Sequence, residues 1–548
     1  MEAYWWREAV VYQVYPRSFC DGNGDGIGDL PGIISRLDYI KSLGVDAIWI
    51  NPFFKSPNDD GGYDISDYFD VLPEFGTLAD VERLLEEAHF RGLKVIIDLV
   101  FNHSSDEHEW FTSSRTSKDN PYRDFYFWRE GRGENPPSNW PSFFGGSAWE
   151  KDQATGEYYL HLFSRKQPDL NWENPAVRNE IHRIIRFWLE KGVDGIRLDV
   201  ISAISKRTGF PDADTTDFNE IIARYYANGP RMKEYIAEMR KEVFTSRTIL
   251  TVGEGPGINP GNAMDYLSED NGLDMIFHFG HMFLDQGPGG RFDPVSWSLD
   301  RFRKVFKEWD DALYPGGWGS VFLGNHDFAR QVSRWGNDGD HREMSAKALL
   351  TLLLTLRGTP FIFAGDEIGM TNLKLDAVSE SRDVETINGF KVAAGKGMTE
   401  EEFLQRANYS GRDNARSPFQ WDDGQYAGFS TMDPWMKVNP NKEFINVKSQ
   451  DNDQHSILNY FRQLVSMRKS NKGLIYGDMQ LHETGNVPLM AFDRVFGDDR
   501  YRIIISFSNH QVNIPVSVSG CEVILSNASL SNDKSLQPWQ AIVLRMNA

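Results

Sequence analysis

The sequence predicts a (β/α)₈ barrel with a small inserted domain after the third strand and a C-terminal β-sandwich domain. In the first half of the chain, short apolar runs alternate with amphipathic helical stretches, which is typical of parallel βαβ units. This periodicity is lost between Ser104 and Trp172, and after Gly473 short strand-like segments are separated by turns. We therefore expect a barrel over 1–103 and 175–472, an inserted domain over 104–174 and a β domain over 473–548.

Eight apolar runs predict the barrel strands. They are Val10–Tyr15, Ala47–Ile50, Lys94–Leu99, Gly195–Leu198, Ile249–Val252, Met275–His278, Val321–Leu323 and Pro360–Phe363. Helices are predicted between them. The first covers Ile33–Leu43, and the second covers Thr77–Arg91 with Thr77 as its cap.

Helical periodicity returns sharply after the insertion. Asn174 can cap a helix, Pro175 suits its first turn, and Gly192 can end it in a left-handed conformation. A long polar segment, 371–447, then precedes a last amphipathic helix predicted over Ser456–Ser470.

The two smaller regions are predicted from composition and turns. The insertion is rich in Ser, Asn, Pro and aromatic residues, and it is too long for a loop without structure of its own. In the C-terminal region, Tyr501–Phe507 and Ile514–Val518 are predicted to be strands.

Composition excludes several classes of function. The net charge of −21 argues against nucleic-acid or anionic-membrane binding, which need clustered Lys and Arg, and it fits a small neutral substrate. Only two cysteines, Cys20 and Cys521, are present, so neither a disulfide framework nor a cysteine-based zinc site is expected. The sequence shows no signal peptide and no run long enough to span a bilayer. We expect a cytoplasmic protein that is a monomer or a weak homo-oligomer.

Polar residues end four of the predicted strands, where the active sites of barrel enzymes lie. The third strand is followed by His103, the fourth contains Arg197 and is followed by Asp199, and the fifth is followed by Glu254. His326 and Asp327 follow the seventh strand. Because the carboxyl ends of parallel strands meet at one rim, these side chains are expected to converge.

The converging carboxylates predict glycoside cleavage with retention. Such an enzyme needs a nucleophilic carboxylate and a protonated carboxylic acid about 5–5.5 Å apart. We assign Asp199 as the nucleophile, kept ionised by Arg197, and Glu254 as the general acid and base. Asp327 is expected to bind sugar hydroxyls and to favour the cationic transition state. His103 and His326 are expected to donate hydrogen bonds to glucose.

These strand ends resemble the signature regions of the α-amylase family (glycoside hydrolase family thirteen), and within it the oligo-1,6-glucosidase and α-glucosidase group. Four further segments carry the resemblance over the whole chain: Val11–Phe19, Gly62–Tyr68, Gln167–Trp172 and Gly411–Arg416. The family implies a barrel, an inserted domain B and a C-terminal β domain. It implies an α-glucosidase that releases glucose from the non-reducing ends of short α-glucosides.

The resemblance also implies roles for single residues. Asp64 and Arg412 would pair and grip the far hydroxyls of the terminal glucose, which makes the enzyme exo-acting. Tyr63 would stack on that ring, and Gln167 is a marker of the group near the site. Val200 directly follows the nucleophile, and in this group Val accompanies α-1,6 cleavage. The expected substrates are therefore isomaltose, isomalto-oligosaccharides or isomaltulose.

A glycine-rich loop predicts a structural metal. Oxygen-bearing side chains alternate with glycines over Asp21–Asp29, an arrangement that can wrap Ca²⁺ or Mg²⁺, although the closing Glu of an EF-hand is missing. By resemblance, the ligands would be Asp21, Asn23, Asp25 and Asp29, with the Ile27 carbonyl contributing. No cofactor is expected to take part in catalysis.

Three positions differ from the sequence that is usual in this group. Phe328 follows Asp327 where a polar residue is common, and Gly255 follows Glu254 where a larger residue is common. Ala364 stands where Gln is often found. Phe328 and Gly255 are predicted to place an aromatic ring and an open space near the leaving group.

Three alternatives remain open. A sucrose isomerase or another transglucosylase would use the same catalytic residues, but the Arg-Leu-Asp-Arg-Asp run of sucrose isomerases is replaced here by Ser-Leu-Asp-Arg-Phe-Arg at 298–303. Trehalose-6-phosphate hydrolysis would need a basic phosphate pocket, which the sequence does not place. An inactive binding subunit would lack the carboxylates that this chain retains.

Overall fold

A computed structural model describes residues 4–246, 248–268, 270–314, 316–529 and 534–546. Its largest sheet holds eight parallel strands in the order β11-β10-β9-β5-β2-β1-β15-β14. A parallel bridge between Ile276 and Gly319 joins the two edge strands, so the sheet closes into the predicted barrel. The strands are β1 (Val11–Val14), β2 (Ala47–Ile50), β5 (Lys94–Val100), β9 (Gly195–Asp199), β10 (Leu250–Gly253), β11 (Met275–Ile276), β14 (Ser320–Val321) and β15 (Thr359–Phe363).

Longer helices cover the outside of the barrel. They are α3 (Leu30–Ser35), α4 (Leu37–Ser42), α5 (Leu78–Phe90), α7 (Pro175–Glu190), α9 (Met232–Glu242), α10 (Leu299–Leu313), α12 (Arg342–Thr355) and α17 (Ile457–Ser470). Thr77 and Asp80 form a capping box at the start of α5, and Asn174 caps α7 as predicted. Such a cap contributes about 1 kcal/mol.

The helix predicted over Ile33–Leu43 is wrong in its bounds. It is divided into α3 and α4 at Arg36, whose backbone leaves the helical region at φ −110 and ψ 6. The Arg36 guanidinium stacks on the Trp421 ring at 4.2 Å, a contact with a distant segment that local periodicity does not reveal.

The inserted segment carries its own small sheet. Helix α6 (Glu109–Ser114) and strands β6 (Trp128–Arg129), β7 (Trp149–Lys151) and β8 (Tyr158–Leu160) lie within it, and the strand order is β6-β8-β7. An apolar cluster joins its buried side chains, among them Trp140 and Trp149, to the segment after β9, among them Val200, Phe210 and Tyr226. We call this cluster the domain B cluster. It connects the insertion to the strand end that carries Asp199.

The C-terminal region forms two antiparallel sheets. Strands β16 (Asp478–Leu481), β17 (Leu489–Phe496), β18 (Asp499–Ser506), β22 (Ala541–Met546) and β20 (Cys521–Ser526) form one sheet, and β19 (Val512–Asn513) pairs with β21 (Ser535–Leu536) in the other. The predicted strand Ile514–Val518 is wrong, because β19 ends at Asn513, although the N–H of Ile514 makes one further bond, to the Lys534 carbonyl at 2.8 Å. Its alternate residues Ile514, Val516 and Val518 nevertheless pack against the apolar core of this domain.

The long segment 371–447 is partly helical and returns to the barrel rim. It contains α13 (Val384–Gly395), α14 (Glu400–Ser410) and the short α15 (Asp413–Arg416). This segment brings Asp383, Arg412 and Arg416 to the residues after β14.

The remaining elements are short. They are α1 (Trp5–Glu8), α2 (Pro16–Phe19), β3 (Phe54–Lys55), β4 (Asp67–Val71), α8 (Phe218–Ile221), β12 (Gln286–Gly287), β13 (Gly290–Pro294), α11 (Gln331–Trp335), α16 (Val447–Asp451), α18 (Lys472–Tyr476), the π-helical turn η4 (Ile222–Tyr226) and the 3₁₀ turns η1 (Pro73–Phe75), η2 (Arg123–Phe125), η3 (Ile201–Ala203), η5 (Ala263–Asp265), η6 (Asp366–Ile368), η7 (Val378–Glu380) and η8 (Pro440–Glu443).

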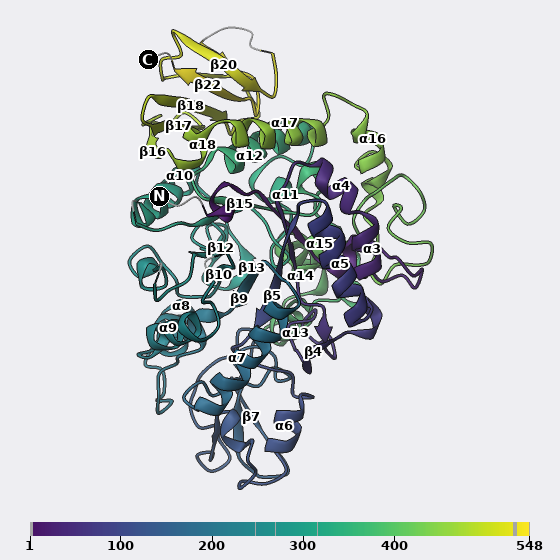
Figure 1. Cartoon of the computed structure of the whole chain (residues 1–548), viewed down its shortest axis with the longest axis vertical. Helices are drawn as coiled ribbons and strands as arrows, with labels where there is room; N and C mark the ends of the chain where they lie inside the picture. Colours follow the sequence, from purple (N-terminus) through teal and green to yellow (C-terminus); the bar gives the residue numbers. More distant parts are fainter. Residues whose placement is uncertain (1–3, 247, 269, 315, 530–533, 547–548) are drawn as a thin grey trace.

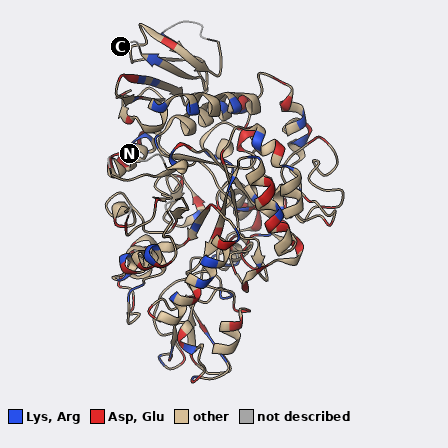
Figure 2. Ribbon diagram, viewed as in Figure 1, with Lys and Arg blue, Asp and Glu red and all other residues tan. Residues whose placement is uncertain are grey.

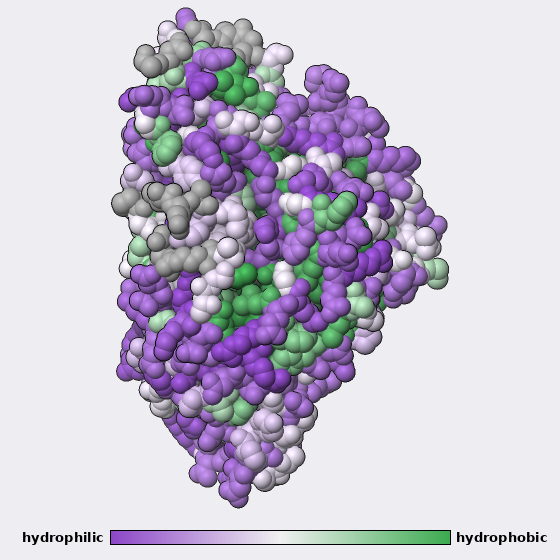
Figure 3. Space-filling view, viewed as in Figure 1, coloured by the Kyte–Doolittle hydropathy of each residue, from purple (hydrophilic) through white to green (hydrophobic). Residues whose placement is uncertain are grey.

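Figure 1 shows the inserted segment at one end of the molecule and the C-terminal sheet at the other, with the barrel between them. Acidic and basic residues are interspersed along most elements (Figure 2). Hydrophilic residues cover most of the face in Figure 3, and hydrophobic residues gather toward its middle. Within the described residues, no helix combines the length and apolar character that crossing a membrane requires.

Candidate active site

Arg197 lies at the centre of the predicted site and binds three carboxylates. Its Nη1 contacts Asp98 Oδ1 at 2.7 Å and Asp199 Oδ1 at 2.5 Å, and its Nη2 contacts Glu254 Oε2 at 2.8 Å. The strands explain this convergence, because β5, β9 and β10 are neighbours in the barrel and their carboxyl ends meet. One guanidinium therefore joins the proposed nucleophile to the proposed acid.

Burial changes the protonation of this cluster. It raises the pKa of Asp199 well above its usual value; Arg197 opposes the rise, and the Glu254 and Asp98 carboxylates add to it. Burial also raises the pKa of Glu254, although the positive charge of Arg197 again opposes the rise. The expected contact between Arg197 and Asp199 is present, but it does not lower the pKa of Asp199 overall. Because three carboxylates share one guanidinium, the cluster can keep a proton at neutral pH, and retention needs that proton on Glu254.

Asp327 lies at the open side of the cluster, with 32% of its side chain exposed. Its Oδ1 accepts from Arg416 Nη2 at 3.0 Å and from Arg412 Nη1 at 3.4 Å. Burial alone would raise the pKa of Asp327, but His326, Arg412 and Arg416 outweigh it and lower that pKa. Asp327 is therefore a carboxylate, the form that can stabilise a cationic sugar.

Tyr63 and His326 form a buried stack beside Asp327. Their rings are 5.2 Å apart and nearly parallel, and the Tyr63 hydroxyl contacts His326 Nε2 at 2.6 Å and donates to Asp98 at 2.8 Å. Burial lowers the pKa of His326 to about 3, so the ring is neutral. Gln13 Nε2 donates to Nδ1 of His326, which leaves the ring proton on Nε2, 3.2 Å from Asp327 Oδ2. Contact of either ring with glucose stays a prediction.

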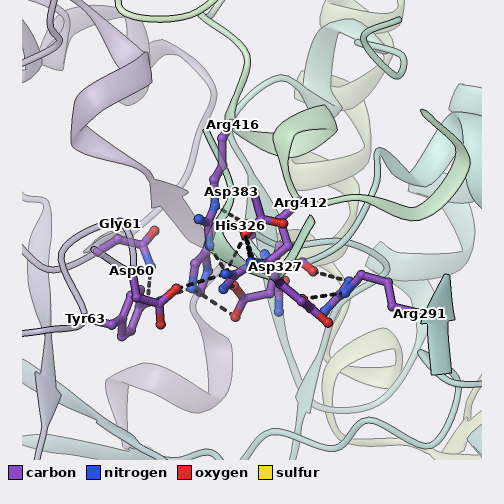
Figure 4. A network of polar contacts seen from close by, with 12 residues as sticks. Asp60, Gly61, Tyr63, Arg291, His326, Asp327, Asp383, Arg412 and Arg416 are labelled. Atoms are coloured by element: carbon purple, nitrogen blue, oxygen red, sulfur yellow. Dashed lines mark hydrogen bonds and ion pairs between the residues drawn. The ribbon is translucent and has the colours of Figure 1, made fainter. Parts of the chain in front are cut away.

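Arg412 pairs with Asp60, and the expected pairing with Asp64 is wrong. Arg412 Nη2 contacts Asp60 Oδ1 at 2.9 Å and Asp383 Oδ1 at 2.6 Å. Figure 4 shows Asp60 and Tyr63 on one side of Asp327 and Arg291 on the other, with Arg412, Arg416 and Asp383 around it. The ion pair beside Asp327 is thus Asp60–Arg412, and its contact with a terminal glucose stays a prediction.

Asp64 instead closes the turn that presents Asp60. Its carboxylate oxygens accept the backbone N–H groups of Asp59 and Asp60 at 2.8 and 3.0 Å, and the side chain is buried. The turn requires Gly61 and Gly62 at φ 61 and 99, where other residues are strained. Burial raises the pKa of Asp64 to about 7.

His103 and Gln167 form a buried pair next to Asp60. Gln167 Nε2 donates to Asp60 Oδ2 and contacts His103 Nε2, both at 3.1 Å, and both side chains are buried. Burial lowers the pKa of His103 to about 4, so it is neutral at pH 7. In this arrangement Gln167 orients Asp60, and direct contact of Gln167 or His103 with sugar stays a prediction.

The structure corrects one of the two predictions near the leaving group. Phe328 is buried against the guanidiniums of Arg291 and Arg334, at 5.0 and 4.9 Å from its ring, and its place near the leaving group stays a prediction. A Cβ on Gly255 would stand 2.2 Å from Ser202 Oγ, so the position is filled by its neighbour and no open space exists there. Ala364 is also buried, and its carbonyl accepts from Arg330.

Comparisons with known proteins identify the family. The family model for the alpha amylase catalytic domain matches residues 13–477. The chain belongs to the α-amylase family. It is 48% identical over 559 residues to the oligo-1,6-glucosidase of Parageobacillus thermoglucosidasius and 42% identical over 555 residues to the glucan 1,6-alpha-glucosidase of Streptococcus dysgalactiae subsp. equisimilis, in each case covering 100% of both chains.

One solved structure extends the comparison to the fold. The trehalulose synthase of Pseudomonas mesoacidophila MX-45 is 44% identical, covers 100% of both chains and superposes with a TM-score of 0.96. The membership of this chain in the α-amylase family therefore rests on sequence and on fold, and it identifies the chain as a glycoside hydrolase.

The loop predicted to hold a metal is a series of tight turns. Asp21 accepts from the backbone N–H groups of Asn23, Gly24 and Gly26, and Asp25 accepts from that of Ile27. Asp29 caps α3 through Oδ1, while its Oδ2 is buried without a hydrogen-bond partner. Among the residues that the structure describes, no group of three His, Cys, Asp or Glu is arranged around a metal position.

Four residues of this α-amylase-family site were not assigned from the sequence: Asp60, Asp98, Asp383 and Arg416. Asp98 lies inside β5 and not at its carboxyl end, so a pattern of polar residues at strand ends does not single it out. Asp60 lies four residues before Asp64 on a turn with two glycines, and Arg416 lies one helical turn after Arg412, so both carried a usable signal. Asp383 lies in a polar segment without local pattern, and only the tertiary structure reveals it.

Proposed function

We propose that the protein is a retaining, exo-acting α-glucosidase that releases glucose from the non-reducing ends of short α-glucosides. The observation that carries this proposal is the Arg197 bridge, which binds Asp199 and Glu254 at the ends of β9 and β10. In the proposed reaction Asp199 attacks the anomeric carbon while Glu254 protonates the leaving oxygen, and a water activated by Glu254 then releases glucose.

The exo mode of action is supported by the buried ion pairs of Arg412. Asp60, Arg412 and Asp383 have almost no exposed surface and stand directly beside Asp327. Charged groups at the closed side can bind the far hydroxyls of one glucose unit, because hydrogen bonds to charged groups are the stronger kind. A glucan that continued beyond that glucose unit would be blocked by these buried ion pairs.

The α-1,6 preference is supported by Val200 and by the relatives. Val200 directly follows Asp199 in the chain, and its side chain is buried in the domain B cluster. Several relatives that match over their full length are named for 1,6-linked substrates. Isomaltose, isomalto-oligosaccharides and isomaltulose are therefore the proposed substrates. The proposed location of the protein is the cytoplasm.

A transglucosylase is the second candidate, because the trehalulose synthase superposes with a TM-score of 0.96. Such an enzyme would form the same glucosyl intermediate but transfer glucose to a sugar instead of water. Hydrolysis is favoured because the relatives named for 1,6-glucosidase activity reach 48% identity.

A product profile tests the proposal. The protein is incubated separately with isomaltose, maltose, sucrose, isomaltulose, trehalose and trehalose 6-phosphate, and every sugar formed is identified. We expect rapid glucose release from isomaltose or isomaltulose and slow release from maltose. Asp199→Asn protein prepared in parallel serves as the blank. Rearranged disaccharides from sucrose would support the transglucosylase instead, and activity confined to trehalose 6-phosphate would overturn the substrate assignment.

We also propose that the loop Asp21–Asp29 binds a structural Ca²⁺. The unpartnered Asp29 Oδ2 supports this, as does the charge around it, because burial together with Asp21 and Asp25 raises the pKa of Asp29 to about 6. A divalent cation held by Asp21, Asn23, Asp25, Asp29 and the Ile27 carbonyl would satisfy that oxygen.

Metal removal tests the Ca²⁺ proposal. We expect a chelator to lower Tm by a few degrees and Ca²⁺ to restore it, because a ligand that binds only the folded protein stabilises it. Activity far below Tm should not change, since the loop contributes no group to the catalytic cluster. An identical Tm with chelator and with Ca²⁺ would contradict the proposal, and Asp29→Asn protein, which should lose the response, is the matched control.

A further inference from the structure

The ladder between β9 and β10 contains one extra residue directly after the nucleophile. Leu198 lies opposite Gly253, and Glu254 donates its backbone N–H to the Leu198 carbonyl at 3.0 Å. In a regular parallel ladder the next bond would run from the N–H of Val200 to the Glu254 carbonyl. That carbonyl instead accepts the N–H of Ile201 at 2.7 Å. Val200 is therefore a β-bulge, and its own N–H is free of the ladder.

The bulge places Val200 in an unfavourable backbone conformation. Its φ of 47 and ψ of 35 are left-handed, and it is the one β-branched residue at positive φ among the described residues. Such a conformation persists only where surrounding structure holds it. Here the Val200 side chain is buried in the domain B cluster, so packing of the inserted domain holds the bulge in place.

The freed N–H is directed at the proposed acid. It donates to Glu254 Oε2 at 3.2 Å, and the same oxygen accepts from Arg197 Nη2 at 2.8 Å. Two donors on Oε2 leave Oε1 as the oxygen that can carry a proton. The charged groups around Glu254 are Arg197 and Asp199 on β9, Asp98 on β5 and Asp327 after β14.

We propose that Val200 is a positioning residue whose bulged N–H, together with Arg197, holds Glu254 Oε2 and directs the catalytic proton to Oε1. This inference rests on the proposed function, in which Glu254 is the acid. Under this inference, Val200 helps to place the catalytic proton, in addition to any effect of its side chain on linkage preference.

A backbone ester at position 200 tests the hydrogen bond. Replacing Val200 by its α-hydroxy acid removes the N–H and keeps the side chain. Because that N–H favours the carboxylate form of Glu254, its loss should raise the pKa of Glu254, and the alkaline limb of kcat/KM should move up by about one pH unit. The matched control is the ester at Ile201, which removes the bond to the Glu254 carbonyl and should leave the limb in place.

Two outcomes of the ester experiment would overturn the inference. One is an alkaline limb that does not move in the Val200 ester, and the other is an equal movement in the Ile201 ester. The activity of Glu254→Gln protein distinguishes failure of the positioning role of Val200 from failure of the proposed function. If Glu254→Gln is inactive while the Val200 ester keeps the wild-type profile, the acid assignment stands and only the positioning role is wrong.

The bulge itself is tested by two ordinary substitutions. Val200→Gly and Val200→Ala both remove the branched side chain, but only glycine adopts positive φ without strain. We expect the Gly variant to melt at a higher temperature than the Ala variant, the reverse of the usual order within a strand. The usual order, with Ala more stable, would show that residue 200 is not held in the left-handed conformation and would overturn the inference.

Discussion

Asp60→Asn is expected to reduce kcat/KM for isomaltose by about 10²–10⁴-fold, because a charged carboxylate that accepts one or two hydrogen bonds from substrate hydroxyls is lost. The substitution also weakens the hold of residue 60 on the Arg412 guanidinium, whose other carboxylate partners are Asp383, Asp327 and Glu385. Steady-state kinetics with isomaltose measures the effect.

Two neighbouring residues provide controls for Asp60. Asp59→Asn should keep near wild-type kinetics, since Asp59 accepts from the Ser164 hydroxyl and contacts none of the proposed catalytic residues. Asp64→Asn should mainly affect stability, because Asp64 holds backbone N–H groups of the turn. A large loss in Asp64→Asn with a small loss in Asp60→Asn would reverse our assignment of the glucose-binding carboxylate.

Glu254→Gln is expected to lower kcat/KM for isomaltose by about 10²–10⁴-fold, the usual contribution of general acid catalysis. Gln keeps the size of the side chain but cannot protonate the leaving oxygen. An activated aryl α-glucoside, whose leaving group needs no proton, should form the intermediate with a much smaller loss. Parallel kinetics on isomaltose and on the aryl glucoside measure the difference.

A surface carboxylate gives the matched control for Glu254. Glu238 lies on α9 and pairs with Arg178 at 2.8 Å, away from the barrel rim, so Glu238→Gln should keep wild-type rates. Near wild-type hydrolysis of isomaltose by Glu254→Gln would show that another group protonates the leaving oxygen.

The barrel and its catalytic rim could be predicted because their signals are local. Strands predicted over four residues each mark β2, β9 and β10 within one residue of their observed bounds, and Asp199 and Glu254 lie within two residues of the ends of the last two. Parallel strands then bring Asp199 and Glu254 together whatever the loops do. That is why the carboxylate pair was found without knowledge of the tertiary structure.

The details that sequence reasoning missed depend on packing between distant segments. Asp60 and Asp64 share one short turn that contains two glycines at positive φ, and the sequence does not show that Asp60 is the carboxylate that faces Arg412. Phe328 is enclosed by Arg291 and Arg334. The left-handed conformation of Val200 was equally hidden, because a β-branched residue at a strand end predicts an extended backbone.

The central claim is a covalent glucosyl intermediate on Asp199, and mass spectrometry tests it most directly. Glu254→Gln protein is mixed with α-glucosyl fluoride, which needs no acid to form the intermediate but leaves its hydrolysis without a general base. The account predicts a mass increase of one glucosyl group, located by peptide mapping on Asp199. An unmodified protein that still turns over the fluoride, or a label on another residue, would contradict it.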